Sequence, residues 1–451
     1  MKSHKWIIAA ASALCIAVSL PLSALAQGPG GNPPSGGSGG GPGGSASDVT
    51  YTAATEITSA ASLEDGVYLS DSADENAILV DTDEEVTLTN PNVTKAGDSD
   101  GGDSCNFYGL NAAVLAKGGT TLTISGGTIT SDASGANGVF SYGGNGGQNG
   151  AAGDGTTVNI SDTVITTSGD GSGGIMTTGG GITNASNLTV TTSGRSSAAI
   201  RTDRGGGTVN VDGGTYTSNG LGSPAIYSTA AITVQNATLV SNLSEGVCIE
   251  SMNTITLTDC DLTANNTQCN GNATFLDTIM IYQSMSGDAD SGTSAFTMTG
   301  GSLTSKSGHV FHVTNTHAVI TLNGVQIVNE DSDKVLLSVC DDGWNGAENN
   351  AELYANAQSL SGTILVGSNS KLTLTLSDGS AFTGSISGEI TNSKGTAISS
   401  EAGTVNVTLD ETSTWTLTAD TYITGFEGNA EQIISNGYTL YVNGVALTGT
   451  K

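Results

Sequence analysis

Acidic residues are the most numerous side chains in this chain that could do chemistry. The 451 residues include 42 Asp and Glu but only 12 Lys and Arg. The adjacent pair Asp341 and Asp342 could supply the general acid and base of a polysaccharide hydrolase. A basic pair that would hold an acidic sugar is missing, because no Arg-x-Lys occurs anywhere. We therefore expect a protein that is not an enzyme, with an atypical polysaccharide lyase or glycoside hydrolase as the alternative.

The arginines form the second group with a chemical use. All three, Arg195, Arg201 and Arg204, lie close together in the sequence. Three guanidiniums on neighbouring strands could bind a sugar acid or another anion through forked hydrogen bonds. Arg201 follows an inward-facing residue and should point outward. Pairing with the nearby acids Asp203 and Asp212 is the alternative, and we favour it.

Two sets of residues are candidates for binding a metal ion. Histidines three positions apart face opposite sides of a strand, which opposes a shared metal site for His309 and His312. A third histidine, His317, follows shortly after, and we expect all three to be packed or surface residues. Three acids in a Gly/Ser loop are weak Ca²⁺ candidates, because flexible loops rich in oxygen can bind that ion. They are Asp98, Asp100 and Asp103. No other cofactor is expected.

Two cysteines are candidates for a disulfide, and one tryptophan is a candidate for stacking on a sugar ring. Five cysteines follow the segment 1–26, and this odd number leaves at least one free thiol. Cys260 and Cys269 flank an Asn-rich turn and are candidates for a disulfide, although Cys260 and Cys248 could instead be small core residues. Trp344 lies in a turn-rich loop, where an exposed ring could stack on a sugar. A loop anchor against the body of the protein is the alternative for Trp344, and we favour it.

The N-terminal sequence predicts export. Residues 1–26 combine Lys2 and Lys5, an apolar core and Ala24-Leu25-Ala26, which is the pattern of a secretory signal peptide. Residues 27–49 are a Gly/Pro/Ser-rich linker that cannot form a core. Removing the signal leaves 12 − 2 = 10 basic residues against 42 acids, a charge of −32. We therefore expect a secreted or surface-associated protein that does not bind nucleic acid and has no transmembrane segment after processing.

A repeated sequence motif of alternating Thr and apolar residues covers most of the chain. The strands that this motif predicts must hold the candidate side chains named above in position. It reads TTLTISGGTITS at 120–131, GTVNVDGGTYTS at 207–218 and SAFTMTGGSLTS at 294–305. Alternation with a period of two is typical of strands, and Gly, Asn and Asp at the joints are typical of turns. Apolar pairs between the phrases, such as Ala199-Ile200, supply a third short strand per unit.

The spacing of the repeat indicates a solenoid. The equivalent inward positions are Ile124, Ile160, Val190, Val211, Val234, Leu257, Met298 and Leu322. Successive gaps between them are 36, 30, 21, 23, 23, 41 and 24, and the shorter gaps define an uninterrupted period of about 21–24. Three strands per unit predict an all-β, single-stranded parallel β-helix over residues 50–424, in which such residues stack in columns. Residues 425–451 are expected to form a β cap.

Three longer phrases carry a family resemblance. AAIRTDRGGGTVNVDGGTYTSNG (198–220), VFHVTNTHAVITLNGV (310–325) and STWTLTADTYITGFEG (413–428) resemble secreted, pectin-lyase-like, adhesin-type proteins of gut anaerobes. The resemblance covers about residues 60–451. It implies a right-handed helix and non-catalytic binding of glycan or extracellular matrix, without supplying catalytic residues. On a stacked rod, recognition should lie on the inserts at 143–155, at 264–290 and around Trp344.

Overall fold

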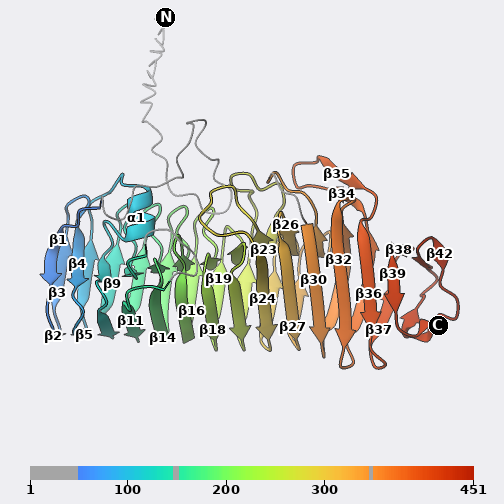
Figure 1. The fold of residues 1–451 in the computed structure, drawn as a ribbon, viewed down its shortest axis with the longest axis horizontal. Coiled ribbons are helices and arrows are strands. Elements are labelled where there is room, and N and C mark those ends of the chain that lie inside the picture. Colours follow the sequence, from blue (N-terminus) through green and yellow to red (C-terminus); the bar gives the residue numbers. More distant parts are fainter. Residues whose placement is uncertain (1–48, 146–151, 345–348) are drawn as a thin grey trace, which may run out of the picture.

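The protein is an elongated stack of short strands (Figure 1). The computed structural model describes residues 49–145, 152–344 and 349–451. The expected signal peptide at 1–26 and residues 27–48 of the expected linker lie outside these ranges. Among the described residues, no helix is both long enough and apolar enough to cross a membrane.

Each coil contributes one strand to a 15-stranded sheet, called sheet A, and in most coils two strands to a 22-stranded sheet, called sheet B. The strands of sheet A are β1 (Ala53–Ile57), β4 (Asn76–Asp81), β7 (Val114–Lys117), β10 (Val139–Tyr142), β13 (Ile175–Thr178), β15 (Ile200–Thr202), β17 (Ile226–Ser228), β20 (Val247–Glu250), β23 (Asp277–Tyr282), β26 (His309–Thr314), β29 (Val335–Val339), β31 (Ser359–Val366), β33 (Ala381–Ser387), β37 (Thr414–Leu417) and β40 (Ile433–Ile434). The first strands of sheet B are β2 (Ala61–Glu64), β3 (Val67–Ser70), β5 (Glu85–Thr89), β6 (Asn92–Lys95), β8 (Thr121–Ser125), β9 (Thr128–Ser131), β11 (Thr157–Ser161), β12 (Val164–Thr167), β14 (Gly181–Thr192) and β16 (Gly207–Ser218). The later ones are β18 (Ala231–Gln235), β19 (Thr238–Ser241), β21 (Thr254–Thr258), β22 (Asp261–Ala264), β24 (Thr293–Thr299), β25 (Ser302–Ser305), β27 (His317–Asn323), β28 (Gln326–Asn329), β30 (Asn349–Asn356), β32 (Ser370–Ser377), β36 (Thr404–Leu409) and β39 (Gly425–Glu427).

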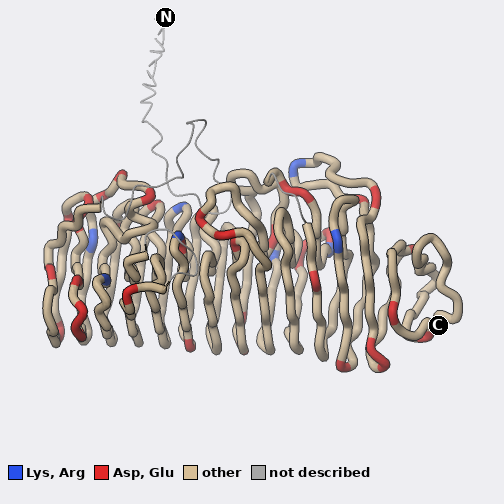
Figure 2. Tube along the Cα trace, viewed as in Figure 1, with Lys and Arg blue, Asp and Glu red and all other residues tan. Residues whose placement is uncertain are grey.

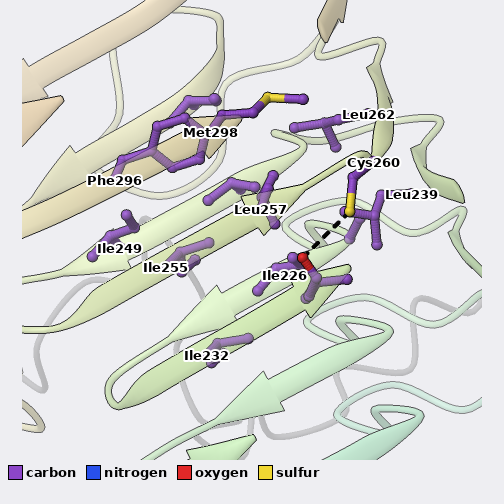
Figure 3. Close-up of a cluster of buried hydrophobic side chains, with 14 of the residues drawn as sticks. Ile226, Ile232, Leu239, Ile249, Ile255, Leu257, Cys260, Leu262, Phe296 and Met298 are labelled. Atoms are coloured by element: carbon purple, nitrogen blue, oxygen red, sulfur yellow. Dashed lines mark hydrogen bonds between the residues drawn. The ribbon is translucent and has the colours of Figure 1, made fainter. Parts of the chain in front are cut away.

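Successive coils pair in parallel, which confirms the β-helix. Strands β17, β18 and β19 pair with β20, β21 and β22 of the next coil, each in parallel. Val211 lies opposite Val234, and Val234 lies opposite Leu257, as the repeat predicts. All three side chains are buried, whereas Thr233 is exposed. Apolar columns of this kind form the continuous core between the sheets, part of which Figure 3 shows.

One predicted repeat position is wrong. Ile160 lies opposite Ala185 rather than Val190, and Ala185 lies opposite Val211. Val190 belongs to the next strand position, where it pairs with Ile165. The true inward position of this coil is therefore Ala185, and the gaps on its two sides are nearly equal. The register was missed because the side chain of Ala185 is small. The repeat pattern therefore assigned the inward position to Val190, a larger apolar residue further along the same strand.

Turns between the two strands of sheet B are formed by residues in the left-handed region. Asp162, Asn187 and Asn236 have φ of 51°, 52° and 56°, and Gly126 and Gly213 occupy the equivalent place in other coils. Asn and Asp tolerate this conformation better than other non-glycine residues, and Gly adopts it without strain. Neighbouring turns are also joined by side chains: Asn187 Nδ2 donates to Asp162 Oδ1 at 2.6 Å.

The two sheets differ in what covers them. Sheet B strands alternate between buried and exposed residues, as β18 does, so their outer face meets solvent. Sheet A strands such as β13, β20 and β23 are buried along their whole length. Their outer face is covered by inserts that project on one side of the rod, including α1 (Asp103–Tyr108) and the hairpin of β34 (Glu389–Thr391) and β35 (Ala397–Ser400) (Figure 1). This covered face is where chemically capable side chains gather.

The C-terminal residues close the far end of the rod. Strands β39 and β40 extend sheets B and A by one further pairing each. A small sheet of β38 (Thr421–Ile423), β41 (Leu440–Val442) and β42 (Val445–Ala446) and a 3-10 helix (Ala430–Gln432) complete the segment. Leu440 is buried in the main core, so the segment packs on the last coil.

Candidate functional site

A single outward column runs along sheet A under the inserts. Register places its members opposite one another from coil to coil. In order, they are Leu79, Leu115, Phe140, Met176, Arg201, Tyr227, Cys248, Met280, His312, Ser338 and Leu365. Most are apolar and pack against the inserts in satellite clusters. Arg201 belongs to one buried polar cluster, and His312 and Ser338 belong to another.

The first, the arginine cluster, fastens inserts to the rod. Arg201 points outward from sheet A as predicted but is 2% exposed, and it pairs with Asp203 at 2.8 Å. Arg204 pairs with Asp288 of the insert after β23 at 2.8 Å. Its guanidinium carbon lies 4.1 Å from the ring centroid of Phe107, which belongs to α1. Local pairing is therefore what the structure shows for these two arginines.

The other parts of the arginine prediction have different outcomes. Asp212 does not join the cluster, because it lies on sheet B and accepts a hydrogen bond from Asn236 at 2.8 Å. Arg195 is exposed, and its guanidinium donates to Asn270 Oδ1 at 2.9 Å. The three arginines thus do not converge on one anion, and only Arg195 presents its charge at the surface.

Buried carboxylates next to this cluster resist ionisation. Glu250 is buried, and Tyr227 donates to its Oε2 at 2.6 Å. Burial raises the pKa of Glu250 to about 7, and two hydrogen-bond donors, Ser284 and Tyr227, oppose the rise. Burial likewise raises the pKa of Asp203 to about 6 against the opposing charge of Arg201. The carboxyl groups of Glu250 and Asp203 are therefore protonated in part near neutral pH.

The second polar cluster, the histidine–carboxylate cluster, joins the β26 histidines to acids. His309 Nδ1 and His312 Nδ1 each lie 2.7 Å from Ser338 Oγ. The prediction that these histidines face opposite sides is wrong: adjacent Val310 and Phe311 of β26 both pack in the main core, so alternation is broken between the two histidines. His312 Nε2 lies 3.3 Å from Asp342 Oδ2, and both side chains are fully buried.

Two further acids lie beside these groups. Glu245, Asp277 and Asp342 are electrostatic neighbours, and Glu245 and Asp277 are buried. Burial, reinforced by the neighbouring acids, raises the pKa of Asp277 well above its ordinary value. Burial lowers the pKa of His309 to about 3, so that imidazole is neutral. The cluster therefore combines three acidic side chains with a neutral His309 and the hydroxyl group of Ser338.

The remaining metal candidates are dispersed. His317 lies on sheet B and pairs with Glu352 at 2.9 Å. Asp98 accepts from the backbone of Ser134 at 2.8 Å, while burial raises the pKa of Asp103 and nearby Arg204 opposes that rise. Across residues 49–145, 152–344 and 349–451, no group of three His, Cys, Asp or Glu side chains stands ready to hold a metal ion. The Asp98, Asp100 and Asp103 candidates are thus not arranged as a Ca²⁺ site.

Trp344 is an anchor rather than an exposed platform. It is 6% exposed, and its ring centroid lies 5.1 Å from that of Tyr282 on sheet A. The favoured loop anchor is therefore confirmed, and the hypothesis of an exposed sugar platform is wrong. The two adjacent acids lie in different environments. Asp342 is buried, whereas Asp341 is exposed and accepts a hydrogen bond from the side chain of Asn349 at 2.6 Å.

The predicted disulfide is also wrong. Cys260 is buried in the main core among Leu239, Leu257 and Leu262, as Figure 3 shows, and its thiol points to the Val234 carbonyl at 3.5 Å. Cys269 lies in an insert outside sheet A and points to the Phe275 carbonyl. All five described cysteines, at 105, 248, 260, 269 and 340, are free thiols. The alternative of a small core residue holds for Cys260.

An open groove lies where Ala152 and Gly153 meet the coil corners at the starts of β14, β16, β18 and β21. Its volume is about 420 Å³. Its lining residues are Ala152, Gly153, Gly180, Ile182, Gly205, Gly206, Gly207, Thr208, Thr229, Ala230, Ala231, Met252, Asn253 and Thr254. None of these residues is charged. Figure 2 shows that acids are scattered over the inserts and the turns, so this groove differs from the acidic parts of the surface.

Comparisons with protein-family models, curated proteins and solved structures give no match to this chain. The groove, the inserts and the two buried clusters are the features of the structure that bear on function. Sequence reasoning missed the groove and Glu245, Glu250 and Asp277. Glu250 and Asp277 lie in apolar sheet A strands, where a lone acid was a usable signal.

Proposed function

We propose that the protein is a secreted, non-catalytic β-helical adhesin that binds neutral glycan in the groove beside the 143–155 insert. The observation that carries this proposal is an uncharged groove of about 420 Å³ at the junction of an insert and a stack of coils. Binding residues are commonly found on loops held by a rigid scaffold. The adhesin class comes from the resemblance of the chain's repeats.

The lining suits a sugar with many hydroxyl groups. Glycines at 205–207 form part of the lining, and the hydroxyl groups of Thr208 and Thr254 offer hydrogen-bonding groups to a ligand. Met252 is 48% exposed and supplies an apolar surface for a sugar ring. With 12 − 2 = 10 basic residues against 42 acids after removal of the signal peptide, the protein has a formal charge of −32 and repels acidic polysaccharides, which favours a neutral ligand.

The inserts beside the groove are held in place before any ligand binds. Arg204 ties the insert containing Asp288 to the loop before β16, and Phe107 of α1 packs on the same guanidinium. Removing one partner of a buried ion pair costs more stability than removing one partner of an exposed pair, because the remaining charge is left without solvent. A site organised beforehand loses less entropy on binding.

The alternative, polysaccharide cleavage, would need two carboxyl groups facing one sugar bond. Asp341 and Asp342 point to different partners, Asn349 and Thr274, so this pair does not form such a site.

The proposal is tested by incubating the secreted full-length protein with arrays of neutral and acidic glycans and of matrix proteins. Reducing ends and ultraviolet absorbance of unsaturated products are read in parallel, because hydrolysis and elimination produce these signals. Binding to neutral glycans without product formation is the expected result. Product formation, or binding restricted to acidic polymers, would contradict the proposal.

A further inference from the structure

Two smaller depressions lie on the outer face of sheet B beside the groove. One has a volume of about 320 Å³, and its lining includes Asn184, Asn210 and Thr233. The other has a volume of about 220 Å³, and its lining includes Thr123, Asn159 and Asn184. Register places these five residues opposite one another from coil to coil. Because Asn184 lines both depressions, they form one trough, which we call the amide track.

The groove and the amide track are neighbours on the same strands. Ile182, Thr208 and Ala231 line the groove. Each of them lies two residues before a member of the track, in β14, β16 and β18 respectively. Residues two apart in a strand point to the same face and lie about 6–7 Å apart. The groove therefore opens onto the track.

Hydrogen bonds along the rod fix the amide groups of the track. Asn184 Nδ2 donates to Asn159 Oδ1 at 2.9 Å, and Asn210 Nδ2 donates to Asn184 Oδ1 at 2.9 Å. A side-chain amide has two N–H donors and an oxygen with two lone pairs, so Asn184 keeps one donor and one acceptor position beyond these bonds. Sugar hydroxyl groups both donate and accept, and they match such a row. Polar groups that are fixed before binding also lose less entropy when a ligand binds.

The charge of the track favours a neutral ligand. Among the described residues that line the two depressions, Asp212 alone is charged. Hydrogen bonds from Asn236 and Gln235 lower the pKa of Asp212, so its carboxylate stays ionised. A uronic acid, sulfate or phosphate group would meet this negative charge without a basic residue of the lining to pair with.

The groove and the track together are long and narrow. They extend across β8, β11, β14, β16, β18 and β21, which pair in this order. Neighbouring strands lie about 4.8 Å apart, so the outermost of these strands are separated by about 24 Å. This length exceeds that of a single sugar ring and suits a chain of several sugars.

We propose that the glycan bound by this protein is an extended, neutral polysaccharide, which lies along the rod with one part in the groove and the rest on the amide track. This inference rests on the proposed function, because it identifies the class of glycan that the groove takes. The terminal sugar of a branched glycan would occupy the groove alone. A linear chain would also contact the fixed amides of Asn159, Asn184 and Asn210.

The test measures how affinity depends on the length of the sugar chain. The probes are β-1,4-linked oligosaccharides of glucose, mannose or xylose with two, four and six units, titrated into the secreted full-length protein. For the sugar that binds, affinity should rise by roughly tenfold or more from two to six units. Thr233→Trp, on the track but outside the groove, should remove this gain and leave the affinity for two units unchanged. Thr375→Trp, in the same outward row further along the rod, is the matched control and should keep the gain.

Equal affinity of the wild type for two and six units would overturn this inference alone, and that measurement needs no variant to fold. A gain with length that Thr233→Trp keeps would also overturn it, because the chain would then not lie on the track. The same holds if a branched neutral glycan of the array binds and none of these linear chains does. If no neutral glycan binds at all, the proposed function fails, and this inference fails with it.

Discussion

Glu250→Gln should change how the stability of the protein depends on pH. The pKa of Glu250 is about 7 in the folded protein against an ordinary value of 4.5. Below pH 4.5 the carboxyl is protonated in both states, and the variant changes little. Between pH 4.5 and 7 the unfolded state releases a proton that the folded state keeps, so wild-type stability falls as pH rises. The difference between these two pKa values corresponds to about 3 kcal/mol, fully developed above pH 7.

The assay is urea unfolding of wild type and Glu250→Gln at pH 4.5 and at about pH 8. Gln keeps the shape of Glu and can still accept the hydrogen bond of Tyr227 without carrying a charge. Relative to wild type, the variant should gain about 3 kcal/mol between the two pH values. Glu427→Gln, at an exposed position, serves as the control and should follow wild type. A difference between wild type and Glu250→Gln that does not vary with pH would refute the reasoning.

Further predictions concern the core, the anchor and the thiols. Val234→Ala should lower the free energy of unfolding in urea by about 1–3 kcal/mol, because it leaves a cavity in a stacked column. Exposed Thr233→Ala should lower it by under about 0.5 kcal/mol. Equal losses would contradict the inward register. Trp344→Ala should cost about 3–5 kcal/mol because the ring is buried against Tyr282, and an unchanged Tm would show that it is not an anchor. The five cysteines described in the structure should all react with a thiol reagent after unfolding without reductant, and a count of three would indicate a disulfide.

The strand pattern was sufficient to predict the fold but not every register. Val211, Val234 and Leu257 were predicted correctly because large apolar side chains recur at constant spacing in a column. Ala185 was missed because the inward position of its coil carries too small a side chain to mark the period. Register is a property of pairing between coils, and one small residue removes its local signal.

The candidate site was harder to predict, because burial by inserts leaves no period in the sequence. Arg201 was correctly placed outside sheet A, yet nothing in its strand shows that inserts cover that face. The sugar-platform hypothesis for Trp344 failed for the same reason, whereas the favoured loop anchor is confirmed. The side chain of His309 was misplaced because alternation is broken within β26, where adjacent Val310 and Phe311 both pack in the main core. Contacts between segments far apart in the sequence, such as Arg204 with Asp288, depend on how inserts fold back.

The central claim is that the groove beside the 143–155 insert recognises a neutral glycan. The most direct measurement titrates the strongest array ligand into wild type, Thr254→Trp and Thr373→Trp. Thr254 lines the groove, and Thr373 lies on the same outward face of sheet B further along the rod. The account predicts that Thr254→Trp weakens binding tenfold or more, about 1.4 kcal/mol, while Thr373→Trp binds as wild type does. Equal affinity of all three proteins would contradict it.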